Sequence, residues 1–120
     1  ITVTEMRAVL VGSATPSVTW TIRHGTDRSA AGAQVVTGGT VTTSVTTGSD
    51  VTTFNDATIV ADSFIWLETT AKSGTVTELH VTIVYTVMVV VGAVVQPVSV
   101  PVYVVIRPLG VCRVAVVMSS

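Results

Sequence analysis

Residues 77–106 read TELHVTIVYTVMVVVGAVVQPVSVPVYVVI, and this stretch decides the fold. The opening residues alternate between apolar and polar side chains, with Leu79, Val81, Ile83 and Tyr85 on one side and Glu78, His80, Thr82 and Thr86 on the other. A period of two with one apolar side is the pattern of a half-buried β-strand. Valine then dominates residues 87–106, which carry no charge. Because β-branched side chains fit a pleated sheet and crowd a helix, the whole stretch predicts strands.

The valine-rich end, residues 87–120, predicts two buried strands, one over 87–95 and one over 98–106, joined at Gln96-Pro97. A further turn over 107–110 and a last strand over 111–117 are predicted to follow. The same run is long and apolar enough for a membrane span, which is the alternative interpretation. The prolines inside the run, and the lack of a flanking basic cluster or aromatic belt, favour the two strands. We therefore expect no membrane partner.

Upstream segments show related patterns. Residues 18–23 alternate, with Val18, Trp20 and Ile22 on the apolar side, and predict a strand. Residues 3–11 predict the first strand, and the segment Gly12 to Pro16 predicts a turn between the two. The continuous apolar run in 63–70 predicts a central strand covered on both faces, followed by a turn over 71–74.

Other extended pieces complete an all-β pattern. The threonine-rich segment 40–47 has little to bury and predicts an edge or surface strand. No segment shows a helical period over three turns. The chain predicts about nine short strands separated by glycine-rich turns, which is typical of an antiparallel β-sandwich with a jelly-roll-like arrangement. We expect residues 1–120 to form a single domain of this class.

The composition indicates a protein that assembles. Hydrophobic residues make up 48% of the chain and charged residues 11%, well below the roughly 25% charged residues of soluble domains. The formal net charge of −1 directs the chain toward neither nucleic acid nor an anionic membrane. A soluble monomer with a plain surface is the alternative. If the chain assembles with copies of itself, we predict that the interface lies in the valine-rich end, at Val89, Val91, Val95, Val102 and Val104.

Residue types that carry catalysis are few and scattered. His24 and His80 are the two histidines, and no His/Cys/Asp/Glu cluster has the spacing of metal ligands. No nucleophile, base and orienting group can be matched, so we expect no enzyme, no cofactor and no metal, and a hydrolase is the least favoured function. Trp20 and Trp66 occupy apolar strand positions, where core packing is favoured over a sugar-stacking role.

Two polar loops, over 24–32 and 48–56, are the candidate recognition sites. They carry the candidate residues Asp27, Arg28, Asp50 and Asp56. Loops on a rigid sandwich commonly carry recognition, so a carbohydrate- or host-surface-binding module is the alternative function. Within the first loop, the neighbouring charges of Asp27 and Arg28 also predict a local ion pair of small energetic value.

Two stretches resemble a family. WTIRHGTDRSAAGAQVVTGGTVTTS over 20–44 and SDVTTFNDATIVADSFIWLETTAKSGTVTELHVTIVYT over 49–86 resemble a recurrent segment of small structural proteins of tailed phages. The resemblance covers residues 17–86, and Val60 stands where the family pattern has proline. It implies a small β-sandwich of fibre-like or decoration-like virion proteins, commonly trimers.

The resemblance also implies a function. A protein of this kind is a non-enzymatic subunit of the virion, either a capsid decoration, a head fibre or a tail fibre, and its partners are capsid or tail proteins. Fibre tips also bind glycans on the host surface. The residues favour the same interpretation, because an uncharged apolar end suits a subunit that buries surface against copies of itself, usually with cyclic symmetry. We expect neighbouring subunits to cover the valine-rich end.

Overall fold

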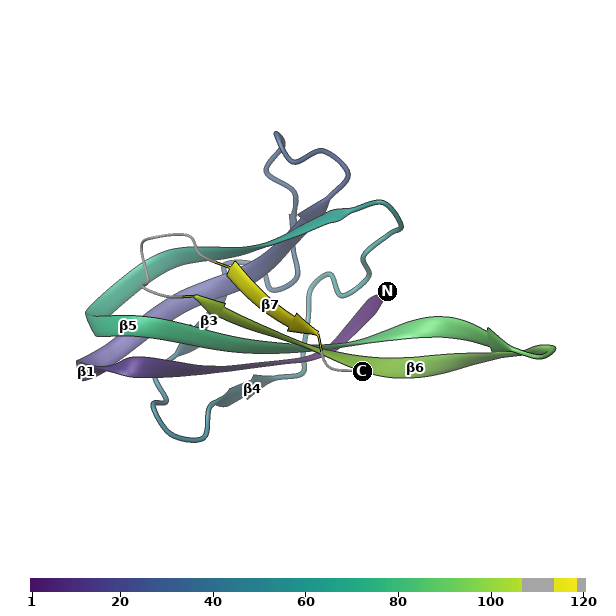
Figure 1. Cartoon of the computed structure of the whole chain (residues 1–120). Coiled ribbons are helices and arrows are strands. Elements are labelled where there is room, and N and C mark those ends of the chain that lie inside the picture. The colour runs from purple at the N-terminus through teal and green to yellow at the C-terminus, as the bar shows by residue number, and fades with distance from the viewer. Residues whose placement is uncertain (107–113, 119–120) are drawn as a thin grey trace.

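The computed structural model describes residues 1–106 and 114–118, with side chains placed for 1–88 and 92–103. Within these ranges the regular structure consists of strands alone (Figure 1). The strands are β1 Thr2–Gly25, β2 Ala33–Gln34, β3 Thr40–Thr42, β4 Ser49–Val51, β5 Phe64–Val91, β6 Val94–Ile106 and β7 Val114–Met118.

The strands form one antiparallel sheet that curls into a half-barrel (Figure 1). The order is β2-β1-β5-β6-β7, and β3 and β4 also pair with β1. The all-β antiparallel prediction is confirmed. The described strands are fewer than predicted, and two of them are much longer, because β1 and β5 each continue through a segment that we expected to be a turn.

The two expected turns form a paired bend in the ribbon of β1 and β5. Gly12 lies opposite Val76, and the register shifts between Ser13 and Ser17, so that the segment 12–17 bulges against 73–76. Ala14 and Thr15 have φ values of 57° and 51°, in the left-handed region. The ribbon turns back on itself here, so the chain changes direction at both predicted turns, 12–16 and 71–74 (Figure 1). The prediction that a strand ends at each turn is wrong, because a bulge bends a strand and keeps it in the sheet.

The bend folds the ribbon over its own apolar face and so encloses the core. Trp20 is fully buried there, and its indole N–H donates to the Thr42 hydroxyl oxygen at 2.9 Å. This confirms the prediction that Trp20 packs in the core. The buried apolar side chains are Val3, Met6, Ala8, Leu10, Val18, Trp20, Ile22, Val35, Ile59, Val76, Leu79, Val81 and Ile83.

The first half of β5 is not the central strand that we expected. Among the described strands only β1 lies alongside 64–73, because β6 begins to pair with β5 at Leu79. Phe64 and Ile65 are accordingly exposed. The prediction that the apolar run in 63–70 is covered on both faces is therefore wrong.

A two-stranded hairpin of β5 and β6 extends beyond the rest of the sheet (Figure 1). The chain reverses at Gly92-Ala93, so the turn predicted at Gln96-Pro97 is wrong, and both of those residues lie within β6. Gly92 has a φ of 64°, which a two-residue hairpin turn requires at its first position. The hairpin contributes to a radius of gyration of 15.0 Å, against about 13.6 Å for a compact chain of this length.

Candidate functional site

The projecting hairpin is an exposed apolar surface of the described structure. β1 begins at Thr2, opposite Thr86, so within the described residues the part of β5 beyond Thr86 has β6 as its only neighbouring strand. Strands advance about 3.4 Å per residue, so β5 extends about 17 Å past the start of β1. We refer to residues 87–100 as the apolar hairpin. No acidic or basic side chain occurs in it, and its exposed apolar side chains include Met88, Val94, Val95 and Val98.

One face of the apolar hairpin continues the face that forms the core. In the β5–β6 register Ile83 lies opposite Val102 and Val87 lies opposite Val98, and alternation places all four side chains on one face. Ile83 is 9% exposed, whereas Val98 is 41% exposed. The face that forms the core therefore continues along the hairpin beyond the described strands that cover it. It stays mainly apolar there, with Gln96 opposite Val89 as a polar residue.

The structure tests part of the predicted interface. Val95 is 55% exposed near the hairpin turn, and Val102 is half-buried where β6 meets the core. The backbones of Val89, Val91 and Val104 lie in β5 and β6, and their side chains lie outside the described part of the structure. The expectation that these two strands are buried is wrong for the single chain, since Val94, Val95 and Val98 are all exposed.

In the first polar loop, Asp27 and Arg28 have separate partners. Asp27 accepts hydrogen bonds from the Ser29 backbone N–H at 2.9 Å and from the Ser29 hydroxyl at 2.6 Å. These bonds favour the charged carboxylate and lower the pKa of Asp27. Arg28 lies over the ring of Trp66, 4.3 Å from its centroid, as a cation–π contact. The structure shows no ion pair between Asp27 and Arg28 among the residues it describes, so that prediction is wrong.

Trp66 departs from the predicted core position. Its side chain is half-buried, with Arg28 over one face of the ring. A Cβ added at Gly32 would lie 2.5 Å from Cη2 of Trp66, so the loop backbone also packs closely against this ring. Trp66 therefore anchors the loop over 24–32 to the sheet, and the ring face that a sugar would stack on is occupied by Arg28.

The two candidate residues of the second polar loop, Asp50 and Asp56, lie at opposite ends of β1. Asp50 on β4 forms an ion pair with Arg7 of β1 at 3.1 Å, and both side chains are about half exposed, so the pair contributes little to stability. Asp56 lies 3.3 Å from Nε2 of the buried His24, at the opposite end of β1. This contact lacks hydrogen-bond geometry, since Nε2 has no hydrogen-bond partner in the structure. The four predicted recognition residues thus form no common site.

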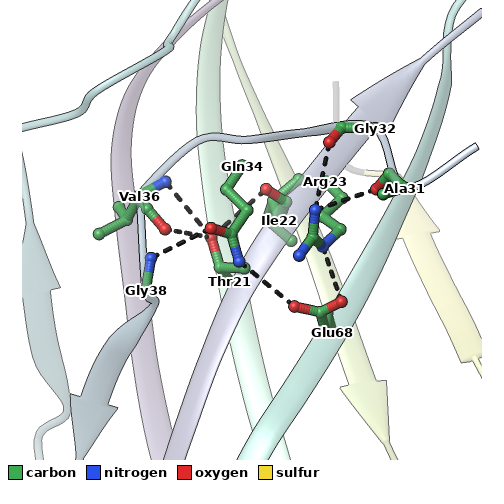
Figure 2. A network of polar contacts seen from close by, with 9 residues as sticks. All are labelled: Thr21, Ile22, Arg23, Ala31, Gly32, Gln34, Val36, Gly38 and Glu68. Carbon is green, nitrogen blue, oxygen red and sulfur yellow. Dashed lines mark hydrogen bonds and ion pairs between the residues drawn. The ribbon is translucent and has the colours of Figure 1, made fainter.

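A polar network that the sequence analysis did not identify fixes the first loop (Figure 2). The guanidinium of Arg23 forms an ion pair with Glu68 at 2.7 Å and donates to the backbone carbonyls of Ala31 and Gly32. The amide of Gln34 donates to Glu68 and accepts from the Gly38 N–H. These contacts join β1, β5 and the segment 31–38. In the β1–β5 register, Arg23 lies opposite Trp66 and Glu68 lies opposite Thr21. No local sequence pattern reveals this register.

The other titratable groups show no arrangement for catalysis. His80, on the polar side of its strand, contacts the Glu78 carboxylate at 2.7 Å. Across residues 1–106 and 114–118, no group of three or more His, Cys, Asp or Glu side chains could hold a metal ion. The same ranges contain no helix with the length and apolar character that crossing a membrane requires.

Comparison of the chain with protein-family models, with curated proteins and with solved structures finds no match.

Proposed function

We propose that this chain is a non-enzymatic structural subunit of a phage virion, either a capsid decoration or a fibre subunit, that acts by self-assembly and by docking on the particle. The apolar hairpin carries the proposal. The hairpin is uncharged, and its exposed Met88, Val94 and Val95 side chains carry the unfavourable free energy of apolar surface in water. Burial of these side chains in an interface removes that unfavourable term. The resemblance of residues 17–86 to tailed-phage structural proteins supports the virion as the place of assembly.

The rest of the molecule suits such a role. The core encloses Trp20, the polar network around Arg23 and Glu68 holds the loop against the sheet, and the hairpin lies at one end of the body (Figure 1). A subunit with its exposed apolar surface at one end suits an assembly with closed symmetry, in which every copy uses the same surface.

Shortening the hairpin tests the proposal. Deleting 88–91 together with 94–97 leaves the native Gly92-Ala93 turn between Val87 and Val98, which face each other as Val91 and Val94 do in the intact chain. We expect the wild-type protein to sediment as an oligomer at micromolar concentration and the shortened variant to sediment as a folded monomer. A wild-type protein that stays monomeric under these conditions would contradict a self-assembling subunit. Antibody labelling of purified particles, viewed by electron microscopy, would then locate the subunit.

A second function, recognition of carbohydrate or of a host surface, is favoured by one observation. Trp66 is half-buried at the loop over 24–32, and aromatic rings at loops often stack on sugars. A sugar would first have to displace Arg28 from the ring. Binding on a glycan array that is lost in Trp66→Ala would support this function, and no binding by the assembled protein would argue against it.

A further inference from the structure

The backbone of the apolar hairpin has two edges with different hydrogen-bonding capacity. A two-residue turn makes Val91 and Val94 a hydrogen-bonded pair, and hydrogen-bonded pairs then alternate along the ladder. In β5 the N–H and C=O groups of even-numbered residues therefore point away from β6. The Thr4 hydroxyl agrees with this assignment, since it donates to the Val84 carbonyl from the β1 side.

On β6, by the same alternation, the groups at 95, 97, 99 and 101 point away from β5. Two of these four residues are Pro97 and Pro101, which have no N–H. β7 pairs with β6 only from Val102 onward. The outer edge of β6 in the hairpin is therefore depleted of donors, as in edge strands that resist further pairing.

On β5 the outward groups beyond Thr86 belong to Met88 and Val90, and both residues keep their N–H and C=O. No strand within the described residues lies opposite them, because β1 begins opposite Thr86. The other uncovered stretch of β5, over 64–78, carries the charged residues Glu68, Lys72 and Glu78, whereas the hairpin carries none. Charge and proline are the usual means of blocking an edge, and this edge has neither.

We propose that β5 of a second copy of this chain pairs antiparallel with this edge. The inference rests on the self-assembly proposed above and names its partner. With a two-fold axis beside Val89, Met88 of each copy pairs with Val90 of the other, which forms about four backbone hydrogen bonds and joins the two hairpins into a four-stranded sheet. Gly92 of the second copy then comes opposite Thr86, so Thr2, which pairs with Thr86 in the single chain, has to leave this edge when the two copies pair. The second copy is the occupant that fits best, because the edge has no charge to select a charged partner and the same edge in another copy is equally neutral.

The difference in hydrogen-bond donors between the β5 and β6 edges also favours a two-fold pair over a closed ring of three copies. A trimer closed by strand pairing would require each hairpin to receive a neighbour on its β6 edge. Pro97 and Pro101 remove the donors that such a neighbour would need. The two-fold pairing uses the β5 edge alone, so each copy contributes one edge and the assembly closes at two copies.

Two proline substitutions at matched positions test the inference. Met88→Pro removes an outward N–H from β5 and leaves the ladder with β6 intact, because residue 88 does not hydrogen-bond to β6. Ser99→Pro makes the equivalent change on β6. Sedimentation velocity over a dilution series is expected to give twice the 12.4 kDa chain mass for the wild type and for Ser99→Pro. For Met88→Pro we expect a dissociation constant raised by at least about tenfold.

Circular dichroism of each variant establishes that the sheet is retained, and Met88→Lys provides a second way to block the edge if the proline variant does not fold. Unchanged association in both edge-blocked Met88 variants would overturn the two-fold pairing while leaving self-assembly in place. Loss of association in Ser99→Pro, or a mass of three chains, would also overturn it. A wild type that is monomeric throughout would instead contradict the proposed function.

Discussion

Gly12→Ala is expected to lower the free energy of unfolding by about 3 kcal/mol, the upper end of the effect of one added methyl group. A Cβ at Gly12 would overlap the carbonyl oxygen of Thr75 and press on Pro16. Both contacts lie in the paired bend, where backbone cannot move without shifting the register of β1 against β5. The bend encloses the core, so strain at this point is expected to loosen the packing of both halves of the ribbon.

Gly25→Ala is the matched control, because Gly25 also lies in β1 and a Cβ there would come no closer than 3.5 Å to its nearest neighbour. Urea unfolding followed by circular dichroism should give a change within about 1 kcal/mol for this variant. Equal losses in the two variants would show that the close approach of Gly12 to Thr75 does not support the bend.

Trp20→Ala is expected to lower the free energy of unfolding by about 3–5 kcal/mol. The side chain is fully buried between the two halves of the ribbon, and its loss leaves both a cavity and a buried Thr42 hydroxyl without its donor. A loss of this size is a large part of the about 5–15 kcal/mol that stabilises an ordinary domain, so the variant should unfold at a much lower urea concentration.

Trp66→Ala removes the same side chain from a half-buried position and is the control for Trp20→Ala. It loses the contact with Arg28, worth about 0.5–1 kcal/mol, together with part of its packing area. We expect a clearly smaller decrease than for Trp20→Ala. A larger decrease in Trp66→Ala would contradict the placement of the core around Trp20.

The strands and the core face could be predicted from the sequence because they depend on local patterns. The alternation in 77–86 predicts the face that carries Leu79, Val81 and Ile83, and all three are buried. The same pattern in 18–23 predicts the burial of Trp20, which the structure confirms. A period of two is set by strand geometry itself, so it does not depend on which strands pair.

The bend could not be predicted in this way. The residues Gly12 to Pro16 and the residues around Gly74 are ordinary turn formers, and each segment by itself indicates a chain reversal. Only their position opposite each other in the β1–β5 register converts two turns into one bulged bend. The hairpin turn was misplaced for a related reason: proline at 97 is the stronger local signal, yet the reversal falls at Gly92, which can adopt a positive φ.

The polar contacts of the first loop also depend on residues distant in the sequence. Arg28 of the loop contacts Trp66 of β5, and Arg23 of β1 pairs with Glu68 of the neighbouring β5. The neighbouring charges of Asp27 and Arg28 indicated a local pair, but Ser29 supplies closer donors to Asp27. Short-range hydrogen bonds of this kind form with little loss of chain entropy, which is why they prevail over an exposed ion pair.

Hydrogen–deuterium exchange of the intact protein at high and at low concentration tests the central claim most directly, namely that copies assemble by pairing the β5 edges of their apolar hairpins. The amides of Met88 and Val90 point away from β6, so in a monomer they have no strand of the described chain to protect them. We predict slow exchange of these two amides in the concentrated protein and fast exchange after dilution, while the amides of the core strands stay protected throughout. Fast exchange at Met88 and Val90 at every concentration, in a protein that is otherwise folded, would contradict the account.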